Sequence, residues 1–275
     1  MNSATGSVRT FEVGVRGGPI ELDVVGSGLP LVLLHGWALD RRVWQPQIRP
    51  LSRHFQVIAV DRRGFGRSAA PPDLGREVED LLVLKRKLGL ERMILVGMSQ
   101  AGRVALQFAL AHPESVCAIV LQGAPLDGFL PGPRREDAIP VSSYAALVRA
   151  GELARMKAMW RSHALMRATA PAARDCLDAL LRDYRGRDLL APEPRPLASI
   201  AGHLEDVYAP ALVVTGERDT RWRQLVGDAL AYGLPNGERA VVAGGEHLCN
   251  LTNPEEFNAL VIAFALRAEA RQPRP

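Results

Sequence analysis

Residues 93–102 read Met-Ile-Leu-Val-Gly-Met-Ser-Gln-Ala-Gly, and this stretch decides how the rest of the chain is interpreted. An apolar run typical of a strand reaches Gly97, presents the hydroxyl of Ser99, and continues at once into a segment of helical composition. Such a turn lifts the serine Oγ above the sheet and places the next backbone N–H at a helix N-terminus, where it can bind a developing oxyanion. We therefore interpret Ser99 as a candidate nucleophile.

The turn departs from the usual pattern at one position. Ala101 stands two residues after the serine, where the common form of this elbow carries glycine, and Gly102 follows immediately. A methyl group needs little more room than a hydrogen atom, so we expect the elbow to form. Short patterns of this kind also occur by chance at strand ends, and the assignment therefore depends on the partners of the serine.

Two later segments supply those partners. A serine hydroxyl needs a histidine to take its proton, and that histidine needs a carboxylate to orient it. Residues 211–216 form an apolar run that leads to Asp219, and a second run from residue 240 leads through a pair of glycines to His247. All three side chains are predicted to follow the carboxyl ends of strands, where open parallel sheets bind ligands.

Each partner also has a purely structural interpretation. Asp219 could cap the helix that follows it, and Glu217 is a rival acid closer to the strand. His247 could be an ordinary loop histidine. Because the three features occur in the order Ser, Asp, His that this kind of site requires, we favour a triad of Ser99, Asp219 and His247.

A fourth feature supplies a second oxyanion donor. The apolar segment 31–34 ends in His35-Gly36-Trp37, a glycine-containing turn early in the chain. Acyl-transferring sites of this type take one backbone N–H from such a turn. We predict that the N–H groups of Trp37 and Gln100 form the oxyanion hole, and we interpret His35 as a bracing residue.

With these motifs on hand, the chain resembles the serine-nucleophile branch of the α/β-hydrolase superfamily. The matching pieces are the turn at 35–37, the loop at 61–68, the elbow at Ser99, the stretch 216–219, and His247 with the segment 253–257. The chain is similar to small cofactor-free members: pimeloyl-carrier-protein methyl ester esterases, 3-oxoadipate enol-lactonases, and haloperoxidase- or perhydrolase-type esterases. The resemblance implies an α/β fold with a mostly parallel central sheet flanked by helices and an inserted helical lid.

The resemblance also implies a reaction. We expect a serine esterase that cleaves a small-molecule carboxylic ester, lactone or thioester through an acyl-enzyme, without a metal or organic cofactor. Superfamily members that open epoxides or remove halides attack with aspartate, so Ser99 disfavours those reactions. Other acyl or carbon–carbon bond hydrolases, perhydrolases and lyases on the same triad remain alternatives, as does a non-catalytic protein that binds a small ligand.

The order of patterns along the chain predicts one domain with an insertion. Residues 1–125 and 208–275 are assigned to the α/β core. A hairpin is expected over residues 10–25, strands near 31–35, 55–60, 92–98 and 116–122, and helices over 76–89 and 100–111. Residues 126–207 contain no convincing strand and are predicted to form the lid. Met156, Met159 and Trp160 recur there at roughly helical spacing, which is typical of packing against the body; lining of the substrate pocket is the alternative.

Composition agrees with this class of protein. The chain has 275 residues, 47% of them hydrophobic, which is enough for a large core. Its net charge of +4 is spread among interleaved acidic residues, so we expect no nucleic-acid partner. Three scattered cysteines and the lack of a secretory or membrane-spanning pattern favour a cytoplasmic protein without a membrane partner. The oligomeric state is not predicted.

Overall fold

A computed structural model describes residues 7–129, 137–192 and 197–271 of the chain. Its centre is an eight-stranded sheet in the order β1-β2-β4-β3-β5-β6-β7-β8. The strands are β1 (Arg9–Val15), β2 (Gly18–Val25), β3 (Pro30–Leu34), β4 (Gln56–Val60), β5 (Met93–Met98), β6 (Val116–Gln122), β7 (Ala211–Gly216) and β8 (Gly237–Val242). β2 pairs antiparallel with β1 and β4, and all other neighbours are parallel. The predicted α/β fold is confirmed.

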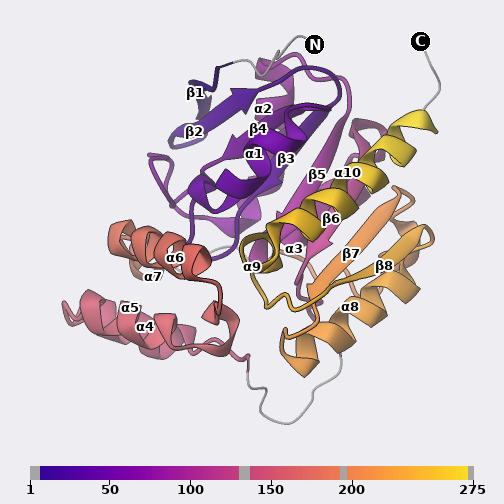
Figure 1. Cartoon of the computed structure of the whole chain (residues 1–275). Coiled ribbons are helices and arrows are strands. Elements are labelled where there is room, and N and C mark those ends of the chain that lie inside the picture. The colour runs from indigo at the N-terminus through magenta and orange to yellow at the C-terminus, as the bar shows by residue number, and fades with distance from the viewer. Residues whose placement is uncertain (1–6, 130–136, 193–196, 272–275) are drawn as a thin grey trace.

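Helices cover both faces of this sheet (Figure 1). α1 (Gln45–Leu51), α9 (Cys249–Thr252) and α10 (Pro254–Ala270) pack on one face, and α2 (Glu77–Lys87), α3 (Gln100–Ala111) and α8 (Arg221–Gly233) pack on the other. The inner parallel strands are buried on both sides, which explains why they read as continuous apolar runs instead of alternating patterns.

Between β6 and β7, the described residues form four further α-helices: α4 (Val141–Arg149), α5 (Leu153–Arg161), α6 (Pro171–Asp183) and α7 (Arg187–Leu190). They gather as one group at one end of the sheet (Figure 1). Tyr144, Trp160 and Leu177 join the apolar cluster that α1 and α10 form with the sheet, so this group packs directly on the body. Between residues 126 and 207 the described part of the chain contains no strand, as the sequence predicts.

The bounds of the helices and strands lie close to those predicted from the sequence, and the largest difference is at β8. β6 and α3 have the predicted bounds. β8, in contrast, begins at Gly237, three residues before the apolar run at residue 240. Glu238 and Arg239 belong to this strand although they are polar, because β8 is an edge strand and its side chains are only half-buried. No helix among the described residues has the length and apolarity needed to cross a membrane.

Candidate active site

Ser99 lies in the sharp turn between β5 and α3. Its backbone has φ 49° and ψ −119°, in a region that residues other than glycine rarely adopt. The turn is fixed by two backbone hydrogen bonds, because the Ser99 N–H donates to the Gln122 carbonyl at 2.7 Å and the Ser99 carbonyl accepts from the Gly102 N–H at 2.8 Å. Strain of this kind, of about 1–3 kcal/mol, persists where the surrounding structure enforces it and is concentrated at functional sites.

Two glycines make room for this turn. A Cβ at Gly97 would lie 2.7 Å from the Ala101 carbonyl oxygen, and one at Gly102 would lie 2.4 Å from the Cβ of Ala124. The helix α3 therefore lies close to β5 at Gly97, and close to the segment that follows β6 at Gly102. Ala101 is fully buried, so the protein accommodates its methyl group at the position where the usual elbow carries glycine.

Asp219 and His247 form a buried pair beside this turn. The His247 Nδ1 lies 2.9 Å from the Asp219 Oδ2, and both side chains are almost completely inaccessible to solvent. The other ring nitrogen, Nε2, is buried and has no hydrogen-bond partner among the described residues. Ser99 and His247 line the same small cavity. The structure thus brings the three predicted residues to one place.

The structural alternatives for the acid do not apply. Thr220, and not Asp219, caps α8, because its Oγ1 accepts the Arg223 N–H at 3.2 Å. Glu217 is exposed, and its carboxylate accepts from the Gly244 N–H at 2.7 Å without contacting the histidine. Asp219 uses its second oxygen, Oδ1, to accept the Thr220 N–H at 2.7 Å, which fixes the orientation of its carboxylate.

The end of β6 also contributes to the site, and sequence analysis missed it. Gly123 has φ +55°, and a Cβ at this position would lie 2.6 Å from the Cε1 and 2.8 Å from the Nδ1 of His247. The bare backbone of Gly123 therefore forms one wall of the imidazole site. The signal was available, since a glycine directly after an apolar strand marks a place where another group approaches the backbone closely.

A buried polar network holds the loop that carries His247. The Gln122 Nε2 donates to the Asn250 Oδ1 at 2.9 Å and to the His247 carbonyl at 3.3 Å. Asn250 in turn donates to the Val43 carbonyl at 3.0 Å, and the Gln47 Nε2 donates to the Asn250 carbonyl at 2.8 Å. This network joins β6, α1 and α9, and it positions the histidine from three elements.

The predicted oxyanion loop follows β3. Trp37 and Gln100 both line the larger cavity next to Ser99, and neither backbone N–H donates to a carbonyl within the described part of the chain. Ala38 has φ 58°, in the left-handed region, as does Ser99. Among the described residues, these are the only two non-glycine residues with a positive φ. Both strained residues therefore adjoin the predicted oxyanion donors.

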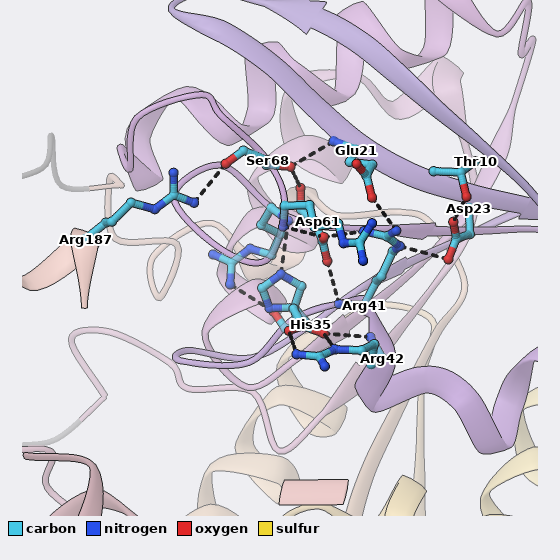
Figure 2. A network of polar contacts seen from close by, with 12 residues as sticks. Thr10, Glu21, Asp23, His35, Arg41, Arg42, Asp61, Ser68 and Arg187 are labelled. Carbon is cyan, nitrogen blue, oxygen red and sulfur yellow. Dashed lines mark hydrogen bonds and ion pairs between the residues drawn. The ribbon is translucent and has the colours of Figure 1, made fainter. Parts of the chain in front are cut away.

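His35 braces this loop, as the sequence suggests. Its Nε2 accepts the Arg62 N–H at 3.0 Å, so Nδ1 carries the proton and donates to the Gly36 carbonyl at 2.8 Å. Complete burial and the nearby Arg62 guanidinium lower the pKa of His35 to about 3, and the ring stays neutral. Figure 2 shows His35 within a larger set of polar contacts, in which Arg41 pairs with Glu21 and Asp23.

The side chain of Arg62 joins the two halves of the predicted oxyanion hole. It donates to the His35 carbonyl at 2.9 Å and to the Gln100 Oε1 at 3.1 Å, while its Nε pairs with Glu77 at 2.6 Å. Both members of this ion pair are buried. One guanidinium therefore links the Trp37 loop to the start of α3. The sequence contains this arginine in the loop at 61–68, but nothing local indicates which groups it contacts.

The cavity beside Ser99 has a volume of about 350 Å³, which is in the range of sites for small molecules. Of the lid residues proposed for its lining, Trp160 contributes to the small cavity shared by Ser99 and His247. Met156 is fully buried in the apolar core, and Met159 is 43% exposed; neither lines a cavity that contains Ser99. Leu165 and Met166, further along the same segment, do line the small cavity.

Comparison with known proteins adds independent findings. The family described as alpha/beta hydrolase fold matches residues 30–144. A curated relative from Serratia proteamaculans, named putative carbamate hydrolase RutD, is 31% identical over 266 residues, which cover 92% of this chain and 98% of the relative. Among solved structures, the esterase RhEst1 from a Rhodococcus species is 26% identical with a TM-score of 0.76, and the alignment covers 94% of this chain and 98% of that one.

The enol-lactonase from Burkholderia xenovorans is 20% identical with a TM-score of 0.77, over 93% of this chain and 99% of that one, and it supports the fold alone. The similarity to the Serratia protein extends over almost the whole of both chains. Together with the elbow at Ser99 and the sheet order, this similarity shows that the chain belongs to the α/β-hydrolase superfamily and is a hydrolase of that fold.

Proposed function

We propose that this protein is a serine hydrolase that cleaves a carboxylic ester, lactone or thioester of a small molecule through an acyl-enzyme. The observation that carries the proposal is the buried pair of His247 and Asp219. The imidazole lines the cavity that Ser99 also lines, and its Nε2 has no hydrogen-bond partner among the described residues. A neutral imidazole held at Nδ1 by a carboxylate is oriented to accept a proton at Nε2. The Ser99 hydroxyl, which lines the same cavity, is the group that has to lose this proton.

The reaction then follows from these positions. His247 takes the proton of Ser99 as the Ser99 Oγ attacks the ester carbonyl, and Asp219 stabilises the imidazolium that forms. Collapse of the tetrahedral intermediate expels the alcohol, which receives its proton from His247. A water molecule activated by the same nitrogen then hydrolyses the acyl-enzyme and regenerates Ser99.

The charge of the tetrahedral oxygen would be held by the N–H groups of Trp37 and Gln100. Gln100 is the first residue of α3, so its N–H lies at the positive end of the helix dipole. Loss of one such donor typically reduces kcat by about 10²-fold or more. We assign the helices between β6 and β7 as a lid that covers this site, because Trp160, Leu165 and Met166 from that region line the small cavity.

A carbamate is the second candidate substrate. It is favoured by the relative that is 31% identical and is named a putative carbamate hydrolase. The chemistry is compatible with the same residues, since a carbamate presents a carbonyl to Ser99 and a leaving group that needs a proton. An ester and a carbamate differ in the group on the carbonyl, and the triad itself does not distinguish between them.

A substrate panel with an active-site probe tests the proposed function. We expect a fluorophosphonate to label the protein at Ser99, and 4-nitrophenyl esters with graded acyl chains to be hydrolysed with saturation kinetics. A 4-nitrophenyl carbamate in the same panel separates the two candidates, because the preferred class has the larger kcat/KM. A folded protein that binds small ligands but neither reacts with the probe nor turns over any member of the panel would show that the triad is not functional.

Replacing Gly123 with alanine tests the wall behind the histidine. The added Cβ would lie 2.6 Å from the His247 Cε1, so the ring has to move. Since a displacement of about 1 Å can cost about 10²-fold, we expect kcat for a 4-nitrophenyl ester to fall by about that factor. Steady-state kinetics with a fluorophosphonate titration of active sites measures the effect.

Gly244 provides a matched control. It has φ +61°, close to the +55° of Gly123, but a Cβ at Gly244 would meet nothing within 4 Å. Gly244→Ala therefore introduces the same backbone strain without the contact to His247, and we expect kcat to stay within a few-fold of that of the wild type. Equal losses of kcat in the two variants would mean that backbone strain, and not displacement of the imidazole, is responsible.

A further inference from the structure

Asp188 places a carboxylate in the cavity beside Ser99. It lies in α7, and it accepts hydrogen bonds from the Trp37 indole Nε1 at 2.6 Å and from the Tyr184 hydroxyl at 2.6 Å. Both donors are neutral. Neither the triad nor the oxyanion hole uses this side chain.

The other carboxylates that line this cavity each have a guanidinium partner. Four such pairs are present: Asp73 with Arg76, Glu77 with Arg62, Asp127 with Arg103, and Asp137 with Arg223. The third arginine of the cavity wall, Arg63, is paired with Asp80. Within the described part of the chain, Asp188 is thus the one cavity carboxylate without a cationic hydrogen-bond or ion-pair partner, and the lining has no unpaired arginine to compensate its charge.

The positive charges near Asp188 are engaged elsewhere. The charge of the adjacent Arg187 also interacts with Asp188, but its guanidinium donates to the Ser68 carbonyl at 2.8 Å. Arg62 attracts Asp188 only from a distance, because its own N–H groups donate to Glu77, the His35 carbonyl and the Gln100 side chain. Burial raises the pKa of the Asp188 carboxyl, since desolvation outweighs the help from its neutral donors. A carboxylate has about four acceptor sites. The Trp37 indole, the Tyr184 hydroxyl and the backbone N–H of Asp188 itself engage three of them, so capacity for one more donor remains.

We propose that Asp188 forms a subsite for a positively charged amino or ammonium group of the substrate. The inference rests on the proposed function and adds a substrate class, namely esters or carbamates that carry a cation. Trp37 links the subsite to the reaction centre, because its backbone N–H belongs to the predicted oxyanion hole and its indole binds Asp188. The cation therefore lies about one tryptophan side chain away from the carbonyl that Ser99 attacks. Phe65 and Leu126 line the same cavity and provide apolar surface for the chain between the two groups.

Isosteric substrate pairs test this subsite. On the acyl side, 4-nitrophenyl 6-ammoniohexanoate is compared with 4-nitrophenyl heptanoate; on the alcohol side, butyrylcholine is compared with 3,3-dimethylbutyl butyrate. We expect the wild type to prefer the cationic member of at least one pair by about tenfold in kcat/KM, the scale of one hydrogen bond or ion pair to a charged group. In Asp188→Asn this ratio is expected to fall to about one.

Asp183→Asn is the matched control. Asp183 ends α6 and pairs with Arg42 of the body at 2.7 Å, so it is another lid carboxylate that contacts the core, but it is exposed and lies outside the cavity. Its substitution is expected to leave the cationic preference unchanged. The ratio of kcat/KM for the cationic and the neutral substrate separates two roles of Asp188, binding of the cation and positioning of Trp37. A purely structural role would lower kcat/KM equally for both members of a pair.

An experiment without variants covers the case in which Asp188→Asn does not fold. Butylammonium is expected to inhibit hydrolysis of a neutral 4-nitrophenyl ester by the wild type competitively, and butyrate is expected to inhibit much more weakly. No cationic preference in either pair, a preference that survives in Asp188→Asn, or equal inhibition by the two ions would overturn the subsite. A wild type that hydrolyses no ester or carbamate and is not labelled at Ser99 would instead refute the proposed function.

Discussion

Ser99→Ala is expected to abolish turnover of a short 4-nitrophenyl ester while the protein remains folded. The substitution removes only the Oγ, and the elbow backbone is held by hydrogen bonds of the Ser99 N–H and carbonyl that alanine retains. Loss of a triad nucleophile typically lowers kcat by about 10⁶-fold. Because the left-handed backbone is equally strained with either side chain, we expect the melting temperature to stay close to that of the wild type. Steady-state kinetics and thermal denaturation measure the two effects.

A serine outside the active site, in the lid, provides the control for the effect of a serine-to-alanine substitution and for nonspecific labelling. Ser162 is exposed at the end of α5 and donates to the Ala158 carbonyl at 2.8 Å, so Ser162→Ala should retain activity and fluorophosphonate labelling. Cys249 is the neighbouring thiol that could be suspected of replacing the nucleophile. Burial raises the pKa of that thiol, so it stays protonated. Substantial turnover by purified Ser99→Ala would therefore rule out the proposed mechanism.

The parts of the site that could be predicted from sequence are those that depend on local patterns. Ser99 directly follows the apolar strand β5, Asp219 comes three residues after the apolar strand β7, and His247 follows the short apolar run that ends β8. Parallel strands bring their carboxyl ends to one edge of the sheet. The helix α3 was predictable for the same reason, since its apolar positions and Gly97 just before it are close together in the chain. To predict these features it was enough to assume that the strands belong to one sheet; their order in the sheet was not needed.

The remaining features depend on contacts between distant segments. Gln122 and the carbonyl of His247 are 125 residues apart in the chain, and Trp37 meets Asp188 across 151 residues. Met159 and Trp160 are adjacent, yet one is exposed and the other lines a cavity, because neighbouring side chains on a helix point about 100° apart. Helical spacing alone does not say which face of α5 meets the body, and the lid predictions were therefore the weakest.

Asp219→Asn is expected to reduce kcat by about 10⁴-fold, the loss typical of a triad histidine held in the wrong tautomer. The direction follows from the contacts of this carboxylate. Its Oδ1 accepts the Thr220 N–H at 2.7 Å, so the carbonyl oxygen of an asparagine has to remain there and its amide NH₂ has to face His247. The His247 Nδ1 then becomes an acceptor, and the ring proton moves to Nε2. An imidazole protonated at Nε2 cannot take the proton of Ser99.

The rival acid supplies the control for this effect. Glu217 is two residues away and its carboxylate accepts from the Gly244 N–H, so Glu217→Gln changes a carboxylate on the same loop without touching the imidazole. We expect this variant to keep kcat within a few-fold of the wild type, and both variants to remain folded, since the Thr220 contact is preserved in Asp219→Asn. In Asp219→Asn, kcat for a 4-nitrophenyl ester and the rate of fluorophosphonate labelling should both decrease. If kcat instead dropped in Glu217→Gln and survived in Asp219→Asn, the orienting acid would be Glu217, reached by a movement of the 216–219 loop.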